Sequence, residues 1–184
     1  MYNRVYITHI TKIMELKENS DTYLYFWGGI FSNFHPSPYE HMYVDLKTGQ
    51  ESKLNFSCAE QGYMWEKSMI FGDEETCAKM LSSNNPYKIK KLCKEIKNFN
   101  QDTWDIHKRR VMFDHCWNKY TQNPPLKAYL LESYDRKLVE ASSTDRVWGI
   151  GLNEDIARRT PEEEWPGTNF LGKTLMDIRS KLKK

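Results

Sequence analysis

Charged side chains interrupt an apolar stripe in the segment FSCAEQGYMWEKSMIF, residues 56–71. Glu60, Tyr63 and Lys67 follow one another at intervals of three and four residues, so they share one face of a predicted helix. Met64 lies on the same face. Long charged side chains at such positions either extend past the edge of the core into solvent or line a polar pocket. The spacing alone leaves both interpretations open.

A second helical stripe also contains a lysine among apolar residues. In DTWDIHKRRVMFDHCW, residues 102–117, Trp104, Lys108 and Met112 recur every four residues. The ammonium group of Lys108 is either directed at a phosphate or reaches past the edge of the core. The stripe therefore predicts a helix and leaves the role of its lysine undecided.

Acidic residues and glycines follow a short predicted strand in LVEASSTDRVWGIGL, residues 138–152. Glu140 and Asp145 leave the strand, and Trp148 stands directly before Gly149. Glycines after a strand allow the backbone to approach a ligand closely. A tight turn that an aspartate caps explains the same pattern.

A glycine-containing loop opens onto the last predicted helix in WPGTNFLGKTLM, residues 165–176. Backbone amides at a helix start can hold a phosphate, and Gly167 would let a ligand come close. Ordinary N-capping by Thr168 or Asn169 accounts for the loop equally well. The spacing is neither that of a P-loop nor that of a dinucleotide-binding fingerprint.

These residues need a scaffold of strands followed by helices. The sequence predicts strands at 21–27 and 137–142 and a hairpin around Thr48-Gly49 within 43–57. Helical periodicity occurs at 59–71, 73–82, 86–97, 103–120 and 125–133, and in a final stripe of Leu171, Leu175, Ile178 and Leu182. We therefore predict an α+β fold, rich in helix, with a small β-sheet. Residues 1–20 are predicted as a short strand and connector, and 21–184 as a single domain.

Composition narrows the classes of function. The 184 residues contain 39% hydrophobic residues, enough for one core, and the net charge of +2 gives no overall field favouring nucleic acid or an anionic membrane. The lysine-rich segment 87–97 reads as a solvated helix face, with nucleic-acid contact as the alternative. No apolar run is long enough to span a bilayer, so we expect a soluble, cytoplasmic protein.

Cysteines and histidines show no ligand pattern along the chain. The four cysteines are widely and irregularly spaced, and the five histidines have no paired spacing typical of metal ligands. Cys58 has no histidine nearby in sequence that could act as its base. We therefore expect no disulfide framework, no metal, no cofactor and no thiol nucleophile.

Five segments together resemble the NADAR superfamily, the group that includes the bacterial protein YbiA. They occur in the family's order over about residues 22–182, and they are FSNF, CAEQGYMWEKSMIFGD, FNQDTWDIHKRRVM, LVEASSTDRVWGIGL and WPGTNFLGKTLMDIR. The resemblance implies a YbiA-like α+β fold and an N-glycosidase that cleaves the bond between a base or amine and C1 of a phosphorylated ribose. The implied substrate is ADP-ribose attached to guanine, including guanine in nucleic acid. The alternative is a phosphoribosylamino-pyrimidine of the riboflavin pathway.

The resemblance also implies roles for individual residues. Glu60 and Asp145 correspond to the catalytic carboxylates, one stabilising the positive charge that develops on ribose and the other orienting ribose hydroxyls or the leaving base, with the assignment between them open. Glu140 is the alternative carboxylate. The implied substrate-binding residues are Tyr63, Lys67, Trp104, Lys108, Trp148, Gly149, Gly167 and Asn169. A non-catalytic module that binds ADP-ribose would use the same rings and cations.

The chain departs from the family pattern at three places. Glu66 stands where many members have glutamine, Gly62 replaces a bulky residue, and Cys93-Lys94 replaces a Gly-Arg pair. A lysine lacks the planar fork of arginine, so a phosphate contact at the last place would be less directional. Gly62 is expected to change the shape of one pocket wall.

Overall fold

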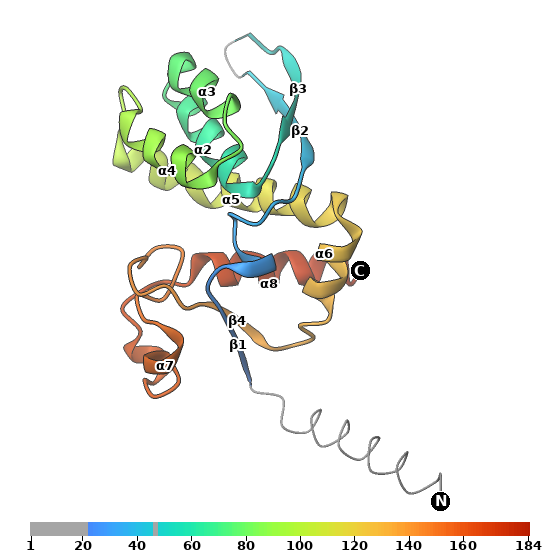
Figure 1. The fold of residues 1–184 in the computed structure, drawn as a ribbon, viewed down its shortest axis with the longest axis vertical. Helices are drawn as coiled ribbons and strands as arrows, with labels where there is room; N and C mark the ends of the chain where they lie inside the picture. The colour runs from blue at the N-terminus through green and yellow to red at the C-terminus, as the bar shows by residue number, and fades with distance from the viewer. Residues whose placement is uncertain (1–21, 46–47) are drawn as a thin grey trace, which may run out of the picture.

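The computed structural model describes residues 22–45 and 48–184 (Figure 1). The strand and connector predicted at 1–20 lie outside the described residues. The strands are β1 (Tyr23–Phe26), β2 (Tyr39–Val44), β3 (Glu51–Phe56) and β4 (Lys137–Glu140). The helices are α2 (Ala59–Ile70), α3 (Glu74–Leu81), α4 (Pro86–Leu92), α5 (Gln101–Gln122), α6 (Pro124–Leu131), α7 (Glu154–Ala157) and α8 (Phe170–Leu182). Single 3-10 turns occur at η1 (Gly29–Phe31), η2 (Cys93–Glu95) and η3 (Glu162–Glu164).

The α+β prediction is confirmed, with two small sheets instead of one among the described residues. β2 and β3 form an antiparallel hairpin in which Val44 faces Glu51. β1 pairs with β4 in parallel, and Phe26 faces Glu140 at the carboxyl ends of both strands. β1 and β4 are far apart in sequence, so the local signals that predict a hairpin could not predict this pairing.

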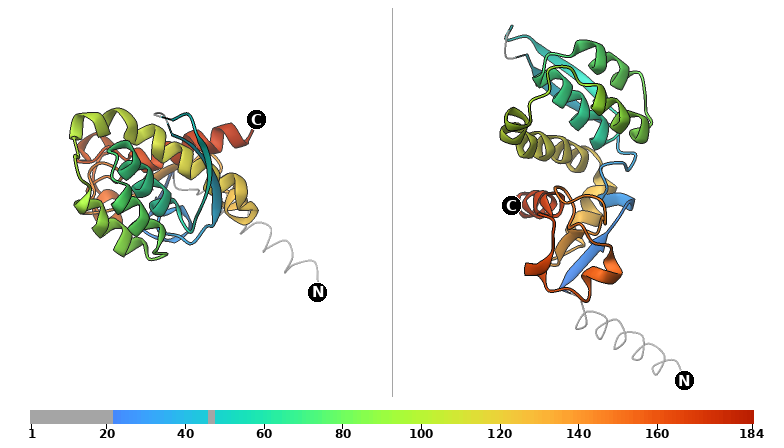
Figure 2. Two further views of the ribbon diagram at one scale, coloured as in Figure 1. Left: turned by 90° about the horizontal axis from the view of Figure 1, so that it is seen from above. Right: turned by 90° about the vertical axis from the view of Figure 1, so that its left-hand side faces the viewer.

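Helix α5 lies between the two sheets. Figures 1 and 2 show α2, α3, α4 and the hairpin on one side of α5, and α8 with the β1–β4 pair on the other. The main core crosses this helix, because Tyr63 on α2, Met112 and Cys116 on α5, and Leu171 and Leu175 on α8 belong to one buried apolar cluster. The central helix therefore joins both halves through apolar burial. No helix in the described ranges is long and apolar enough to cross a membrane.

Local sequence explains most helix boundaries. α5 begins after Asn100, whose side chain accepts a hydrogen bond from the Thr103 amide at 2.8 Å. α4 begins at Pro86 after the capping residue Asn85, which accepts from the amides of Tyr87 and Lys88. These polar caps satisfy amides that lack a partner within the helix.

Two predicted boundaries are wrong for identifiable reasons. The helix predicted at 86–97 ends at Leu92 and continues as η2, because Ile96 adopts an extended conformation and is buried, while Asp73 accepts a hydrogen bond from the Lys97 amide. The hairpin begins at Tyr39, earlier than predicted. Tyr39 and His41 are buried and Glu40 between them is exposed, so a histidine occupies an inward position of the strand that is usually apolar.

The start of α8 is packed against β4 at a glycine. A Cβ atom on Gly172 would lie 2.1 Å from the Leu138 carbonyl oxygen and 2.6 Å from Oδ1 of Asn169. Both contacts are shorter than van der Waals separation allows, and one involves backbone. Only glycine therefore permits this approach of helix and strand.

Gly172→Ala is expected to destabilise the fold by about 1–3 kcal/mol, because the added methyl group overpacks the contact between α8 and β4. Denaturant unfolding of the variant measures the loss. Ser180→Ala, on an exposed position of the same helix, is the control and should change the free energy of unfolding by less than about 0.5 kcal/mol. Equal stabilities for Gly172→Ala and the wild type would contradict the packing described.

Candidate active site

Glu60 lies in the first turn of α2 and is almost completely buried. Its side chain is 4% exposed, and its Oε1 atom has no hydrogen-bond partner. Burial raises the pKa of Glu60 to about 7, the charges of Lys90 and Lys67 lower it, and that of Asp145 raises it. A carboxylate of this kind exchanges a proton near neutral pH.

Glu140, the last residue of β4, is a second carboxylate of the same kind. Its Oε2 atom is buried without a hydrogen-bond partner. Burial raises its pKa to about 7, the charges of Asp145 and Glu60 add to this rise, and Lys90 opposes it. Glu60 and Glu140 hold the two buried, unpartnered side-chain polar atoms of the described residues. Such atoms carry a free-energy cost unless a bound group hydrogen-bonds them.

Asp145 is tied into the loop that follows β4. Its Oδ1 atom accepts hydrogen bonds from the amides of Val147 at 2.9 Å and Trp148 at 2.8 Å. Its own amide donates to Ser142 Oγ at 3.2 Å. The turn expected from the sequence is present. Asp145 therefore fixes the position of Trp148, and its charge raises the pKa of both glutamates.

Aromatic rings join the predicted site segments. Tyr63 contacts Trp104 at a ring-centroid distance of 5.2 Å and Trp148 at 5.4 Å. Trp148 in turn lies 6.2 Å from the ring of Phe170 at the start of α8. The segments predicted from α2, α5, the loop after β4 and the start of α8 thus converge. Tyr63 and Trp104 are buried, whereas Trp148 is partly exposed.

The two predicted phosphate-binding lysines have different surroundings. Lys67 Nζ lies 4.2 Å from the ring centroid of Phe99, 5.2 Å from that of Trp104, and 3.3 Å from Cys93 Sγ. Lys108 Nζ pairs with Asp105 Oδ1 at 2.6 Å. Among the described residues Lys67 has no carboxylate within ion-pair distance, so its charge is less neutralised than that of Lys108.

Asn169 holds the end of β4 in place. It adopts a left-handed backbone conformation with φ 51°, its Oδ1 accepts from the Glu140 amide at 3.0 Å, and its Nδ2 donates to the Leu138 carbonyl at 2.9 Å. These bonds use the side-chain amide that was predicted to contact substrate. We assign Asn169 a positioning role for Glu140.

The predicted glycines bring two loops into contact. The Asn169 amide donates to the Gly149 carbonyl at 3.1 Å, and the Gly167 amide donates to the Ile150 carbonyl at 2.8 Å. A Cβ atom on Gly167 would lie 2.4 Å from the Gly149 oxygen. The glycines therefore serve close loop packing, and whether they also bind substrate stays a prediction.

A buried lysine positions the loop that contacts the start of α2. Lys119 on α5 is fully buried, and its Nζ donates to the carbonyls of Ile30 and Ser32 at 2.8 Å each. The carbonyl of Asn33, in the same loop, accepts from the Glu60 amide at 3.0 Å. Burial lowers the pKa of Lys119 to about 8. Sequence reasoning missed this residue, because nothing local distinguishes it from a solvated lysine.

A cavity of about 760 Å³ opens at the carboxyl ends of β1 and β4. Ala141, the residue after Glu140, lines it together with Trp27 and Gly28. Trp27 is 79% exposed, so its ring is free to stack on a flat ligand. Sequence reasoning also missed Trp27 and Lys90. The first was read as part of a strand and the second as part of a solvated face.

Comparison with known proteins assigns the family. The NADAR domain model matches residues 25–183. The chain belongs to the NADAR domain family. Protein irg-1 of Caenorhabditis elegans is 33% identical over 94% of this chain and 85% of its own length. An N-glycosidase of Acanthamoeba polyphaga mimivirus is 37% identical over 87% of this chain and 96% of its own.

The fold agrees with a solved member of the family. The NMR structure of Escherichia coli YbiA superposes with a TM-score of 0.66 at 25% identity, covering 89% of this chain and 86% of the YbiA chain. The E. coli YbiA sequence, named as an N-glycosidase, is 27% identical over 96% of this chain and 93% of its own. The sequence-based assignment to this NADAR family and to a YbiA-like fold is confirmed.

Glu60→Gln is expected to stabilise the protein at alkaline pH. The folded state keeps a proton on Glu60 up to about pH 7, whereas an ordinary glutamate releases it near 4.5, so this carboxylate destabilises the fold increasingly between these values. Replacing it should raise the free energy of unfolding by up to about 3 kcal/mol at pH 8 and by little at pH 4.

Thermal unfolding at both pH values measures this difference. The control is Glu163→Gln, at an exposed position, and it should have little effect at either pH. A Glu60→Gln variant that is less stable than the wild type at pH 8 would show that Glu60 is not a buried, uncompensated carboxylate.

Proposed function

We propose that this protein is an N-glycosidase that removes ADP-ribose from guanine, including guanine in nucleic acid. The observation that carries the proposal is that Glu60 Oε1 and Glu140 Oε2 are both buried without a hydrogen-bond partner, in parts of the chain that also supply the contacting rings of Tyr63 and Trp148. Membership of the NADAR family, whose relatives include named N-glycosidases, supports the same class of reaction.

The charges around each carboxylate suggest a division of roles. Burial raises the pKa of both carboxyl groups to about 7. Asp145 adds to the rise at each, two lysines (Lys90 and Lys67) oppose it at Glu60, and Lys90 alone opposes it at Glu140. Because the charge of Glu60 also raises the pKa of Glu140, we assign the ionised form to Glu60 and the protonated form to Glu140.

This pair can perform both halves of the hydrolysis. As the bond between C1 and the base nitrogen breaks, the ionised Glu60 stabilises the positive charge on the ribose ring, and Glu140 gives its proton to the leaving nitrogen. A water molecule then bonds to C1, and its proton passes to the Glu140 carboxylate. The products are the free base and a ribose with a hydroxyl at C1.

The remaining residues would bind the two ends of the substrate. Trp148 and the exposed Trp27 offer rings for a base, and Lys67 offers a cation without a carboxylate partner among the described residues. The cavity of about 760 Å³ at the ends of β1 and β4 is in the size range of small-molecule sites, and it is lined by Trp27 and by Ala141, which follows Glu140 in the chain, but not by either carboxylate. A ligand such as ADP-ribose, which joins a base to a diphosphate, requires both ring stacking and a cation.

A substrate panel tests the proposal. The protein is incubated with guanine-ADP-ribosylated DNA, phosphoribosylamino-pyrimidines and NAD, with the Glu60→Gln variant in parallel. Release of ADP-ribose from DNA by the wild type alone is expected. Cleavage of the pyrimidines only would move the assignment to riboflavin-pathway intermediates, and binding of ADP-ribose without turnover of any compound would indicate a non-catalytic binding module.

The pH dependence of kcat/KM separates the two carboxylates. The wild type should be most active near pH 7 and lose activity on both sides, because one carboxylate must be ionised and the other protonated. Glu60→Gln should reduce kcat about 100-fold or more and remove the acidic limb. Glu140→Gln should reduce it similarly and remove the alkaline limb.

The measurement is steady-state kinetics across this pH range, with Glu163→Gln as the control. Ligand affinity should change little in both site variants, because the lost interactions act in the transition state. A Glu140→Gln variant with wild-type turnover and both limbs intact would exclude Glu140 as the acid.

A further inference from the structure

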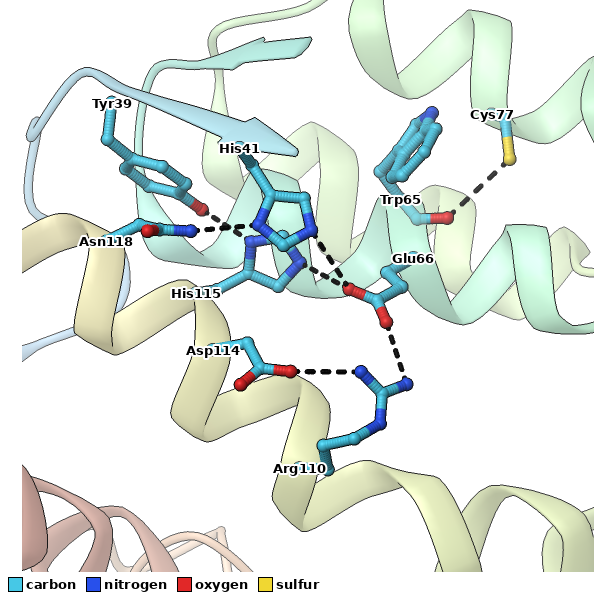
Figure 3. Close-up of polar contacts among 9 residues, drawn as sticks. All are labelled: Tyr39, His41, Trp65, Glu66, Cys77, Arg110, Asp114, His115 and Asn118. Atoms are coloured by element: carbon cyan, nitrogen blue, oxygen red, sulfur yellow. Dashed lines mark hydrogen bonds and ion pairs between the residues drawn. The ribbon is translucent and has the colours of Figure 1, made fainter. Parts of the chain in front are cut away.

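A second cluster of ionisable side chains lies where α2 meets β2 and α5 (Figure 3). It contains His41 from β2, Glu66 from α2 and His115 from α5. His41 is 8% exposed, Glu66 4% and His115 0%. None of the three takes part in the proposed hydrolysis. Their positions in sequence are far apart, which explains why histidine spacing gave no signal.

The three side chains converge on one point. Glu66 Oε2 lies 3.0 Å from His115 Nε2 and 3.6 Å from His41 Nε2, and the three ligand atoms all lie within 4.8 Å of one another. Tetrahedral zinc with bonds of 2.0–2.1 Å separates its ligand atoms by about 3.3 Å. The cluster therefore needs only small side-chain adjustments to surround an ion.

The outer atoms of the three side chains are held by neighbours. His115 Nδ1 is 2.9 Å from the Tyr39 hydroxyl, and His41 Nδ1 is 2.9 Å from the Asn118 amide. With an ion on the Nε2 atoms, His115 Nδ1–H would donate a hydrogen bond to the Tyr39 hydroxyl oxygen, and Asn118 would turn its amide oxygen to accept one from His41 Nδ1–H. Such outer partners fix the orientation of ligating imidazoles.

Arg110 supports the carboxylate in the same way. Its Nη2 donates to Glu66 Oε1 at 2.9 Å and its Nη1 to Asp114 at 3.0 Å, as Figure 3 shows. The bond from Nη2 occupies Oε1, the carboxylate oxygen of Glu66 that faces away from the histidines. Oε2 is thereby directed at the two rings.

The lack of a side chain at Gly62 makes room for this cluster. A Cβ atom on Gly62 would lie 2.3 Å from the Tyr39 hydroxyl and 2.4 Å from His115 Nδ1. A bulky side chain there is incompatible with this arrangement of Tyr39 and His115. Gly62 on α2 therefore permits the close approach of Tyr39 and His115 to the helix that carries Glu66.

We propose that His41, Glu66 and His115 bind a divalent transition-metal ion, with Zn²⁺ the best fit. Two imidazole nitrogens and one carboxylate oxygen are the donors that zinc shares with other first-row metals, whereas Mg²⁺ and Ca²⁺ prefer oxygen alone. A cavity of about 620 Å³ borders His41 and Glu66 and is also lined by His107. It leaves space for a fourth, exchangeable ligand.

Metal titration tests the proposal. Tag-free, chelator-treated protein is titrated with Zn²⁺ in a calorimeter and with Co²⁺ in a spectrophotometer. We expect one saturable site, d–d absorption without a thiolate charge-transfer band, and a higher melting temperature with Zn²⁺. His41→Asn and Glu66→Gln should each weaken metal binding at least about 10-fold. Loss of an outer-shell contact already weakens metal binding by about that factor, and loss of a ligand should cost no less.

The matched control is His107→Asn, which changes a histidine in the same cavity outside the cluster and should bind as the wild type does. Circular dichroism confirms that each variant is folded. Absence of saturable binding, equal affinity in both ligand variants and the wild type, or a thiolate band that assigns the ion to Cys93 would each overturn the proposal. Hydrolysis by Glu60 and Glu140 should survive chelation, so the two proposals fail separately.

Discussion

Burial of a charged helix is the constraint on which this structure depends. Every residue of α2 from Ala59 to Glu66 is buried, and the segment includes two glutamates, Glu60 and Glu66, on different faces of the helix. Burying a carboxylate is costly unless hydrogen bonds or opposite charges compensate it. Hydrogen bonds and opposite charges compensate the burial of one glutamate. The other is buried without such compensation, so the two carboxylates differ in their chemistry.

The two glutamates show how neighbours decide the behaviour of identical groups. Although burial acts to raise the pKa of Glu66, hydrogen bonds and charges from His115 and Arg110 hold it below its ordinary value. Glu60 has only the more distant charges of Lys90 and Lys67, so burial dominates and its pKa rises to about 7. A permanently charged carboxylate suits an ion, and a titrating one suits proton transfer. One helix thus holds two buried carboxylates with different ionisation on different faces.

Much of this arrangement could be predicted from sequence, and the remainder depends on contacts between distant residues. Periodicity located α2 and α5 within two residues, and the family motifs indicated Glu60, Tyr63 and Trp148. Glu140 and Asn169 were also candidates from the sequence, but their surroundings could not be predicted, because the first lies where β4 pairs with β1 and the second bonds to that strand. The meeting of His41 with His115 likewise follows from packing of the hairpin on α5, which no local spacing records.

The parallel pairing of β1 with β4 has a consequence for the order of events on the ribosome. β1 cannot find its partner until residues 137–140 have been synthesised, and the clamp from Asn169 comes later still. Pairings between such distant segments form slowly, since the intervening chain must first be closed into a loop. The nascent chain consequently carries Glu60 without Glu140 while residues 61–139 are synthesised. A prematurely terminated product retains the helices of the first half but cannot assemble the carboxylate pair.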